Sequence, residues 1–279
     1  GLYWCILGIQ NPTGRAAFTQ IEGEHHSDRN DEHVSFVTAT AQNTLLIPSV
    51  VCQQFQSLER LDLINSNVNE ITPSAFNNCT RLSHLTLMLN NFTSIPPRAF
   101  ATATNLQILI LAANRLTAIT PGAFDGTQIR ELDLSINEIT FLHPTAFNSI
   151  AETLNTLRIT DNRLRQLTPG VFTNLVNLID LELNGNRLYT MPDSDAFATL
   201  VNLEILQIAN CGLEFIDPAW FANLQALRVL EIDNNELRHL PANSFNSPNL
   251  VQLGIAGNQL SILDANMFGT SIQSVINIH

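Results

Sequence analysis

Hydrophobic side chains recur at fixed spacing along most of this chain. The stretch 82–100, LSHLTLMLNNFTSIPPRAF, carries apolar residues at its positions 1, 4, 6, 11, 14 and 19 and asparagine at position 9. In LTL one polar residue separates two leucines, and this alternation predicts a short, half-buried strand. The second half spaces its apolar residues three to five apart, which predicts a turn or short helical segment that returns the chain.

Nearly the same string recurs from one end of the molecule to the other. A degenerate copy starts at Val34 and a truncated copy at Ile272. The clear copies start at Leu58, Leu82, Leu106, Ile129, Leu154, Leu178, Leu203, Leu227 and Leu250. From Leu58 to Ile272 there are 214 residues in nine steps, a period of about 24. One such unit cannot bury its own apolar side, so the pattern predicts a stacked array.

Two columns set the register of the array, and we interpret both as scaffold. Position 9 reads Ser66, Asn90, Asn114, Asn137, Asn162, Asn186, Cys211, Asn235 and Asn258. Position 19 reads Phe76, Phe100, Phe124, Phe147, Phe172, Phe197, Phe221, Phe245 and Phe268, with Phe197 displaced by one through an insertion. We expect each asparagine amide to pair backbone groups at a bend, with Cys211 as a weaker substitute, and each ring to fill the outer wall.

The repeated string resembles the leucine-rich repeat, L-x-x-L-x-L-x-x-N/C-x-L, over about 220 of the 279 residues. The I/L-x-P-x-x-F of its outer half is similar to the extracellular typical class, which includes Toll-type receptor ectodomains and the mosquito leucine-rich-repeat immune proteins. A Cys three residues after a Phe, as in Phe76–Cys79, is most like the insect immune group. The resemblance implies an α/β repeat solenoid, a horseshoe of about ten to eleven repeats with a parallel β-sheet on its concave face. We expect an N-terminal cap and polar loop at 1–33 and the array at 34–279.

Composition narrows the range of partners. The chain has 13 basic and 25 acidic residues, a net charge of -12. Phosphate binding needs clustered Lys and Arg, so nucleic acid is not an expected partner, and a cationic partner is weakly favoured. No run approaches the roughly 20 apolar residues of a membrane-spanning helix, so no membrane segment is expected in this chain.

The four cysteines do not show a metal-binding spacing such as C-x-x-C. Cys52 and Cys79 lie 27 residues apart, about one repeat, so stacking could bring them together, and we predict a disulfide there. Cys211 is expected to be a buried free thiol. Cys5 is then free or pairs outside this chain.

The sequence shows no recognisable catalytic or metal-binding motif. The segment 23–33, GEHHSDRNDEH, could be drawn as a metal site, but nothing in it sets a ligand spacing, and we predict a solvated loop. We find no G-x-S-x-G, no H-E-x-x-H and no phosphate-binding glycine loop. We therefore expect no catalytic residue, metal or cofactor, and no enzyme activity.

Two N-x-S/T sequons, at Asn78 and Asn91, predict glycosylation because both sit outside the strands. With the disulfide they favour a secreted, extracellular protein.

The strand side of a repeat array is where partners usually bind. Apolar residues gather there in the second and third clear repeats, and charged residues follow in later ones. The predicted binding residues are Ile64, Met88, Leu89, Ile108, Ile110, Asp133, Arg158, Glu182 and Glu231. A contiguous apolar patch on a surface indicates a partner contact. The alternative for the carboxylates is an ordinary solvated face.

The resemblance and these residues together predict a secreted, non-enzymatic scaffold that binds a protein partner, in innate immunity or extracellular recognition. Two alternatives stay open: an ectodomain fragment of a membrane receptor, and an intracellular enzyme-inhibitor scaffold. An intermolecular contact through Cys5 or through an open C-terminal repeat is a further candidate.

Overall fold

The computed structural model describes residues 4–6, 34–40, 51–72, 74–189, 196–269 and 277–278. The chain forms two compact units, unit 1 over Gly1–Glu138 and unit 2 over Ile139–His279. In these described ranges no helix has the length and apolar run needed to cross a membrane.

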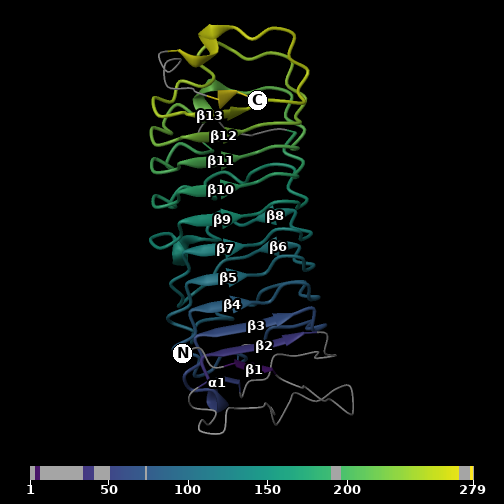
Figure 1. Ribbon diagram of the computed structural model, residues 1–279, viewed down its shortest axis with the longest axis vertical. Helices are drawn as coiled ribbons and strands as arrows, with labels where there is room; N and C mark the ends of the chain where they lie inside the picture. Colours follow the sequence, from purple (N-terminus) through teal and green to yellow (C-terminus); the bar gives the residue numbers. More distant parts are fainter. Residues whose placement is uncertain are drawn as a thin grey trace. The chain divides into compact units, whose positions relative to one another are not determined.

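Unit 1 contains a parallel sheet in which every strand pairs with the strand of the next repeat (Figure 1). Its order is β1 (Trp4–Ile6), β2 (Phe36–Thr40), β3 (Arg60–Ile64), β4 (His84–Thr86), β5 (Ile108–Ile110) and β7 (Glu131–Asp133). The short helix α1 (Val51–Gln54) and strand β6 (Ala118–Ile119) lie in the connecting segments. Parallel neighbours need a crossover, and the rest of each repeat supplies it.

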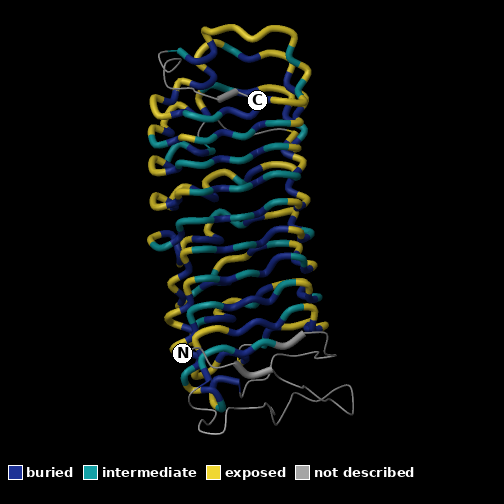
Figure 2. The backbone as a smooth tube through the Cα atoms, in the orientation of Figure 1, coloured by how far each residue is buried: buried dark blue, intermediate teal, exposed yellow. Residues whose placement is uncertain are grey.

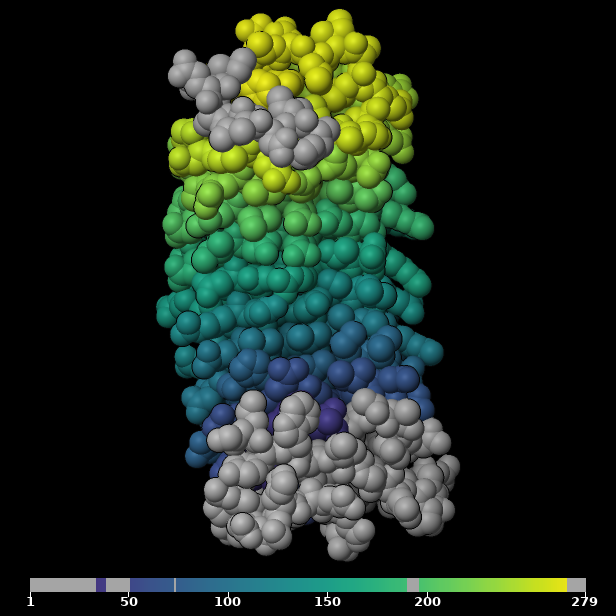
Figure 3. Space-filling view, viewed as in Figure 1, coloured from purple at the N-terminus to yellow at the C-terminus, as the bar shows by residue number. Residues whose placement is uncertain are grey.

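Unit 2 repeats this arrangement. Its parallel sheet has the order β9 (Thr156–Arg158), β10 (Asp180–Glu182), β11 (Ile205–Gln207), β12 (Val229–Glu231), β13 (Gln252–Gly254) and β14 (Asn277–Ile278). Its other elements are β8 (Phe141–Leu142) and the 3-10 helices η2 (Asn148–Ile150), η3 (Pro218–Trp220) and η4 (Ala265–Phe268). Within each unit successive repeats appear as successive bands of colour (Figure 3). The predicted parallel solenoid with repeats of about 24 residues is confirmed.

The two ends of the array differ from the sequence pattern. No repeat is visible before residue 34, yet β1 pairs with β2 and sets Cys5 beside Val37. The predicted start of the last repeat at Ile272 is wrong, because β14 sets Ile278 beside Leu253, at position 4. Apolar residues at 272, 275 and 278 allow either register, and only pairing with β13 distinguishes them.

The interior is formed by the columns of apolar residues (Figure 2). All nine phenylalanines of position 19 are between 0 and 4% exposed. Rings of neighbouring repeats touch, with centroids 5.4 Å apart for Phe76 and Phe100 and 6.2 Å apart for Phe245 and Phe268. The predicted register is therefore confirmed, and the rings occupy the wall opposite the strands.

The predicted asparagine ladder is present at the bends that have asparagine at position 9, from Asn90 to Asn258. The Asn90 Oδ1 accepts hydrogen bonds from the backbone N–H groups of Ser66 (3.0 Å) and Val68 (3.1 Å). Its Nδ2 donates to the carbonyls of Leu63 (2.8 Å) and Leu87 (3.0 Å). One buried amide thus satisfies backbone groups of two repeats, each of which would otherwise cost about 1–3 kcal/mol.

Cys211 is the buried free thiol that the sequence predicts. Its Sγ donates to the Leu183 carbonyl at 3.3 Å, as an asparagine Nδ2 would. Burial raises the pKa of the Cys211 thiol from 9.0 to about 12, so the group keeps the proton that this bond needs.

The predicted Cys52–Cys79 disulfide is present, with Cα atoms 5.0 Å apart. Both cysteines are buried, Cys52 in α1 and Cys79 in the turn after Phe76. The bond ties two adjacent repeats of unit 1 together on their outer wall.

Replacing Phe124 with Ala should lower the free energy of unfolding by about 3–5 kcal/mol, because it removes a fully buried ring from the column. Phe141→Ala is the matched control: this ring is 46% exposed, and its loss should cost about 1 kcal/mol or less. Thermal and denaturant unfolding would measure both, and equal losses would contradict the register.

Candidate functional site

The candidate site lies on the surface formed by repeat positions 3 and 5, which we call the strand face. Position 4 is buried between them, so the pleat directs their side chains outward. In unit 1 these positions are Arg60, Asp62, His84, Thr86, Ile108, Ile110, Glu131 and Asp133, of which Asp62 and Thr86 are buried. In unit 2 they are Thr156, Arg158, Asp180, Glu182, Ile205, Gln207, Val229, Glu231, Gln252 and Gly254.

Two isoleucines occupy the strand face of unit 1. Ile108 and Ile110 lie on β5 and are only half-buried. On one side they pair with His84 and Thr86 of β4, and on the other with the acidic strand β7. An aliphatic strip thus runs between a polar strand and two carboxylates.

The other predicted apolar residues lie at the ends of the neighbouring strands. Ile64 and Met88 occupy position 7 and are half-buried, and Leu89 at position 8 is 49% exposed. The Leu89 N–H donates to the Ala112 carbonyl at 3.1 Å, which keeps adjacent bends in register. The structure therefore brings all five predicted apolar residues onto three consecutive repeats.

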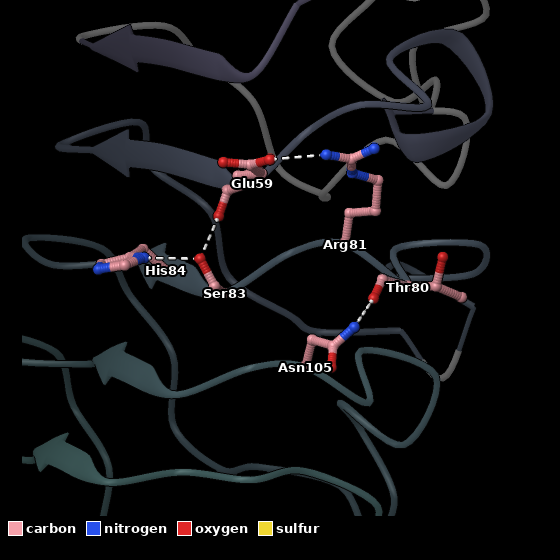
Figure 4. Close-up of polar contacts among 6 residues, drawn as sticks. All are labelled: Glu59, Thr80, Arg81, Ser83, His84 and Asn105. Carbon is pink, nitrogen blue, oxygen red and sulfur yellow. Dashed lines mark hydrogen bonds and ion pairs between the residues drawn. The ribbon is translucent and has the colours of Figure 1, made fainter. Parts of the chain in front are cut away.

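Polar groups at the start of strand β4 bond to one another (Figure 4). Arg81 Nη2 lies 2.8 Å from Glu59 Oε1, and Ser83 Oγ donates to the Glu59 carbonyl at 3.1 Å. Ser83 Oγ also shares a 2.8 Å hydrogen bond with His84 Nδ1. Asn105 Nδ2 donates to a carbonyl of the preceding repeat at 2.6 Å. This side of the strand face is polar and hydrogen-bonded internally.

In unit 2 the predicted charged residues have protein partners. Arg158 Nε lies 2.9 Å from Glu182 Oε1, both side chains being partly exposed. Glu231 accepts a hydrogen bond from the Gln252 amide. A methyl group added at Gly254 would overlap the Glu231 carboxylate, so that glycine gives the carboxylate its space. The remaining predicted charged residue, Asp133, belongs to unit 1 and accepts from the Ser135 N–H at 2.9 Å.

The bend residue at position 8 has a left-handed backbone in every clear repeat. The column reads Asn65, Leu89, Ala113, Ile136, Asp161, Gly185, Asn210, Asn234 and Gly257, all with positive φ. Gly, Asn and Asp tolerate this conformation, whereas a β-branched residue there is an outlier that costs about 1–2 kcal/mol. Ile136 has φ 55° and is 57% exposed. Sequence reasoning missed it, although an isoleucine among asparagines and glycines was the available signal.

The two sequons differ in accessibility. Asn78 is exposed in a turn with φ 65°, beside the bonded Cys79. Asn91 is half-buried and lies two residues after Leu89. The histidine-rich segment 23–33 and the side chain of Cys5 lie outside the described residues.

Metal ligands are not clustered in the ranges that the structure describes. Those ranges contain no group of three His, Cys, Asp or Glu residues that could hold a metal ion. One pocket of about 360 Å³ opens on unit 2, and none of its lining residues titrates: Pro218, Ala219, Ala222, Gln225, Asn243, Asn246 and Pro248.

Comparison with known families gives matches along most of the array. The family described as BspA type Leucine rich repeat region (6 copies) matches residues 37–153. The family described as Leucine rich repeat matches residues 152–212 and 201–260.

Curated relatives match over short segments. Human Leucine-rich repeat-containing protein 3B is 46% identical over 48 residues, which is 17% of this chain and 18% of that protein. Human Leucine-rich repeats and immunoglobulin-like domains protein 1 is 38% identical over 82 residues, 29% of this chain and 7% of that protein. The chain thus spans less than a fifth of either relative.

Solved structures match over most of the chain. A chain of the TLR13–ssRNA13 complex superposes with a TM-score of 0.76 at 22% identity, covering 88% of this chain and 36% of that one. A chain of the Toll–Spatzle complex from Drosophila gives 0.71 at 22% identity, covering 88% and 35%. At this identity the likeness shows the fold.

Replacing Ile136 with Asn should stabilise unit 1 by about 1 kcal/mol, because Asn relieves the left-handed strain and the lost side chain is largely exposed. Thermal unfolding measures the change. Ile139→Asn, a polar substitution at a fully buried isoleucine, is the control and should destabilise strongly. A lower melting temperature for Ile136→Asn would refute the strain argument.

Proposed function

Because this chain belongs to the leucine-rich repeat proteins, we propose that it is a non-enzymatic scaffold that binds a protein partner outside the cell, in innate immunity or extracellular recognition. The observation that carries the proposal is the half-buried aliphatic strip of Ile108 and Ile110 on the strand face of unit 1. The buried positions of each repeat already supply the core, so the fold does not require apolar residues on this outward face. A contiguous apolar surface of this kind marks an interaction site.

An extracellular location is supported by covalent features of unit 1. Disulfides persist in oxidising compartments, and Cys52–Cys79 joins two buried cysteines. The sequon at Asn78 is exposed, as a glycan acceptor must be. These features disfavour an intracellular inhibitor scaffold.

A non-enzymatic role is supported by the state of the charged groups. Arg158 and Glu182 pair with each other, and the pocket on unit 2 offers no acid, base or nucleophile. Catalysis needs such groups held at a substrate.

A receptor ectodomain is the second candidate, and the likeness of the fold to the Toll–Spatzle and TLR13 complexes favours it. It would use the same strand face. A hydrophobic span encoded downstream in the gene would distinguish a receptor from a secreted scaffold.

Secretion from insect cells should yield a protein with the Cys52–Cys79 bridge and glycan on Asn78, Asn91 or both. Mass spectra of the intact protein, and of the reduced and alkylated protein, measure this. An Asn78→Gln, Asn91→Gln variant is the control for glycan mass. Reduced Cys52 and Cys79 with no glycan would refute the extracellular location.

Binding through the strand face can be tested by panning a random-peptide phage library on the immobilised chain. Replacing Ile108 and Ile110 together with Ser should abolish binding of most selected peptides and leave the circular dichroism spectrum unchanged, because both side chains point outward. Val201→Ser, which alters a 48% exposed valine of unit 2, should retain binding. Peptides that bind the double variant as well as the wild type would rule out this face.

A further inference from the structure

Three bend residues of unit 1 form a row, which we call the bend row: Leu89, Ala113 and Ile136. The Leu89 N–H donates to the Ala112 carbonyl at 3.1 Å, and the Ala113 N–H donates to the Ser135 carbonyl at 2.9 Å. These bonds hold the bends of three consecutive repeats in register. Leu89 and Ile136 are 49% and 57% exposed, so the row presents aliphatic side chains to solvent.

The fold itself does not require apolar side chains in this row. At the same position unit 2 has Asp161, Gly185, Asn210, Asn234 and Gly257, residues that suit the left-handed backbone. Leu89 and Ile136 adopt the same conformation at φ 58° and 55° and remain exposed. Strain kept at an exposed position indicates a role beyond stability.

The bend row continues the aliphatic strip of the strand face. Met88 directly precedes Leu89 and is half-buried, and Ile110 lies two residues before the buried Ala112. The row therefore extends the surface of Ile108 and Ile110 toward the strand ends. The opposite side, at the strand starts, is the hydrogen-bonded polar cluster of Figure 4.

Negative charge borders this aliphatic surface. Glu131 and Asp133 of β7 pair in register with Ile108 and Ile110, and Asp133 lies three residues before Ile136. The chain as a whole carries a net charge of -12. Complementary charge attracts and orients a partner, whereas a second copy of this chain would be repelled.

We infer that the bend row and the Ile108–Ile110 strip together bind a basic, apolar segment of the protein partner, with aliphatic or aromatic side chains on the row and Lys or Arg beside Glu131 and Asp133. The inference rests on the proposed protein-binding function and specifies the chemistry of its partner. Asn91 lies two residues from Leu89, so a glycan there would border the row.

The test uses fluorescence anisotropy with a labelled peptide of alternating lysine and leucine and the full chain carrying Asn91→Gln. One control peptide has glutamate for every lysine, and another has serine for every leucine. The lysine–leucine peptide should bind, and neither control should.

Replacing both Leu89 and Ile136 with Asn should weaken binding of this peptide at least about tenfold, while the protein becomes no less stable. Glu131→Gln with Asp133→Asn should weaken binding and flatten its salt dependence, since the amides keep the size and an acceptor oxygen. Ile262→Asn, at a 76% exposed isoleucine of unit 2, should leave binding unchanged.

Wild-type affinity in the Leu89→Asn, Ile136→Asn variant would overturn the inference, as would equal binding of the glutamate peptide or no binding of the lysine–leucine peptide. The Ile108→Ser, Ile110→Ser variant, measured with the same peptides, distinguishes binding through the bend row from binding through the strand face alone. If only that variant loses binding, the strand face remains the site and the bend row is excluded. If neither variant loses binding here, and the phage-selected peptides are equally insensitive, the proposed function fails as well.

Discussion

Buried backbone groups at the bend after each strand constrain this structure more than any other feature. The chain turns inward there, and its N–H and C=O groups lose water. A single asparagine amide supplies both the acceptor and the donors, as Asn90 does for Ser66, Val68, Leu63 and Leu87. Because the amide bonds two repeats at once, the ladder also sets the register in which neighbouring strands pair.

The same bend explains where exposed side chains of unusual type can occur. Its left-handed residue lies outside the ladder, so backbone strain is a main limit on its identity. Most repeats have Asn, Asp or Gly at this left-handed position. Leu89 and Ile136 are exceptions, and they lie next to the aliphatic strip of β5. A rigid scaffold thus carries an apolar surface for which its own stability gives no reason.

The two units use their strand faces differently. In unit 1 the isoleucines of β5 meet the carboxylates of β7, an arrangement suited to a partner that is both apolar and basic. In unit 2 the predicted charges are engaged by neighbours, Arg158 with Glu182 and Glu231 with Gln252. Partly exposed pairs of this kind contribute little to stability. The proposed contact is placed on unit 1 because the aliphatic strip of Ile108 and Ile110 lies there.

Much of the fold could be predicted from the sequence alone, because each repeat encodes which side chains face the interior. The Phe124 and Asn90 columns, the strand positions and the Cys52–Cys79 spacing all follow from the period of about 24 residues. Hydrogen bonding between repeats decided the rest. These hydrogen bonds pair β1 with β2 and set the register of the last repeat through Ile278. In the stacked repeats Ile136 has a left-handed, exposed position. Periodicity specifies an inside and an outside, but pairing and backbone handedness exist only once neighbouring repeats are in contact.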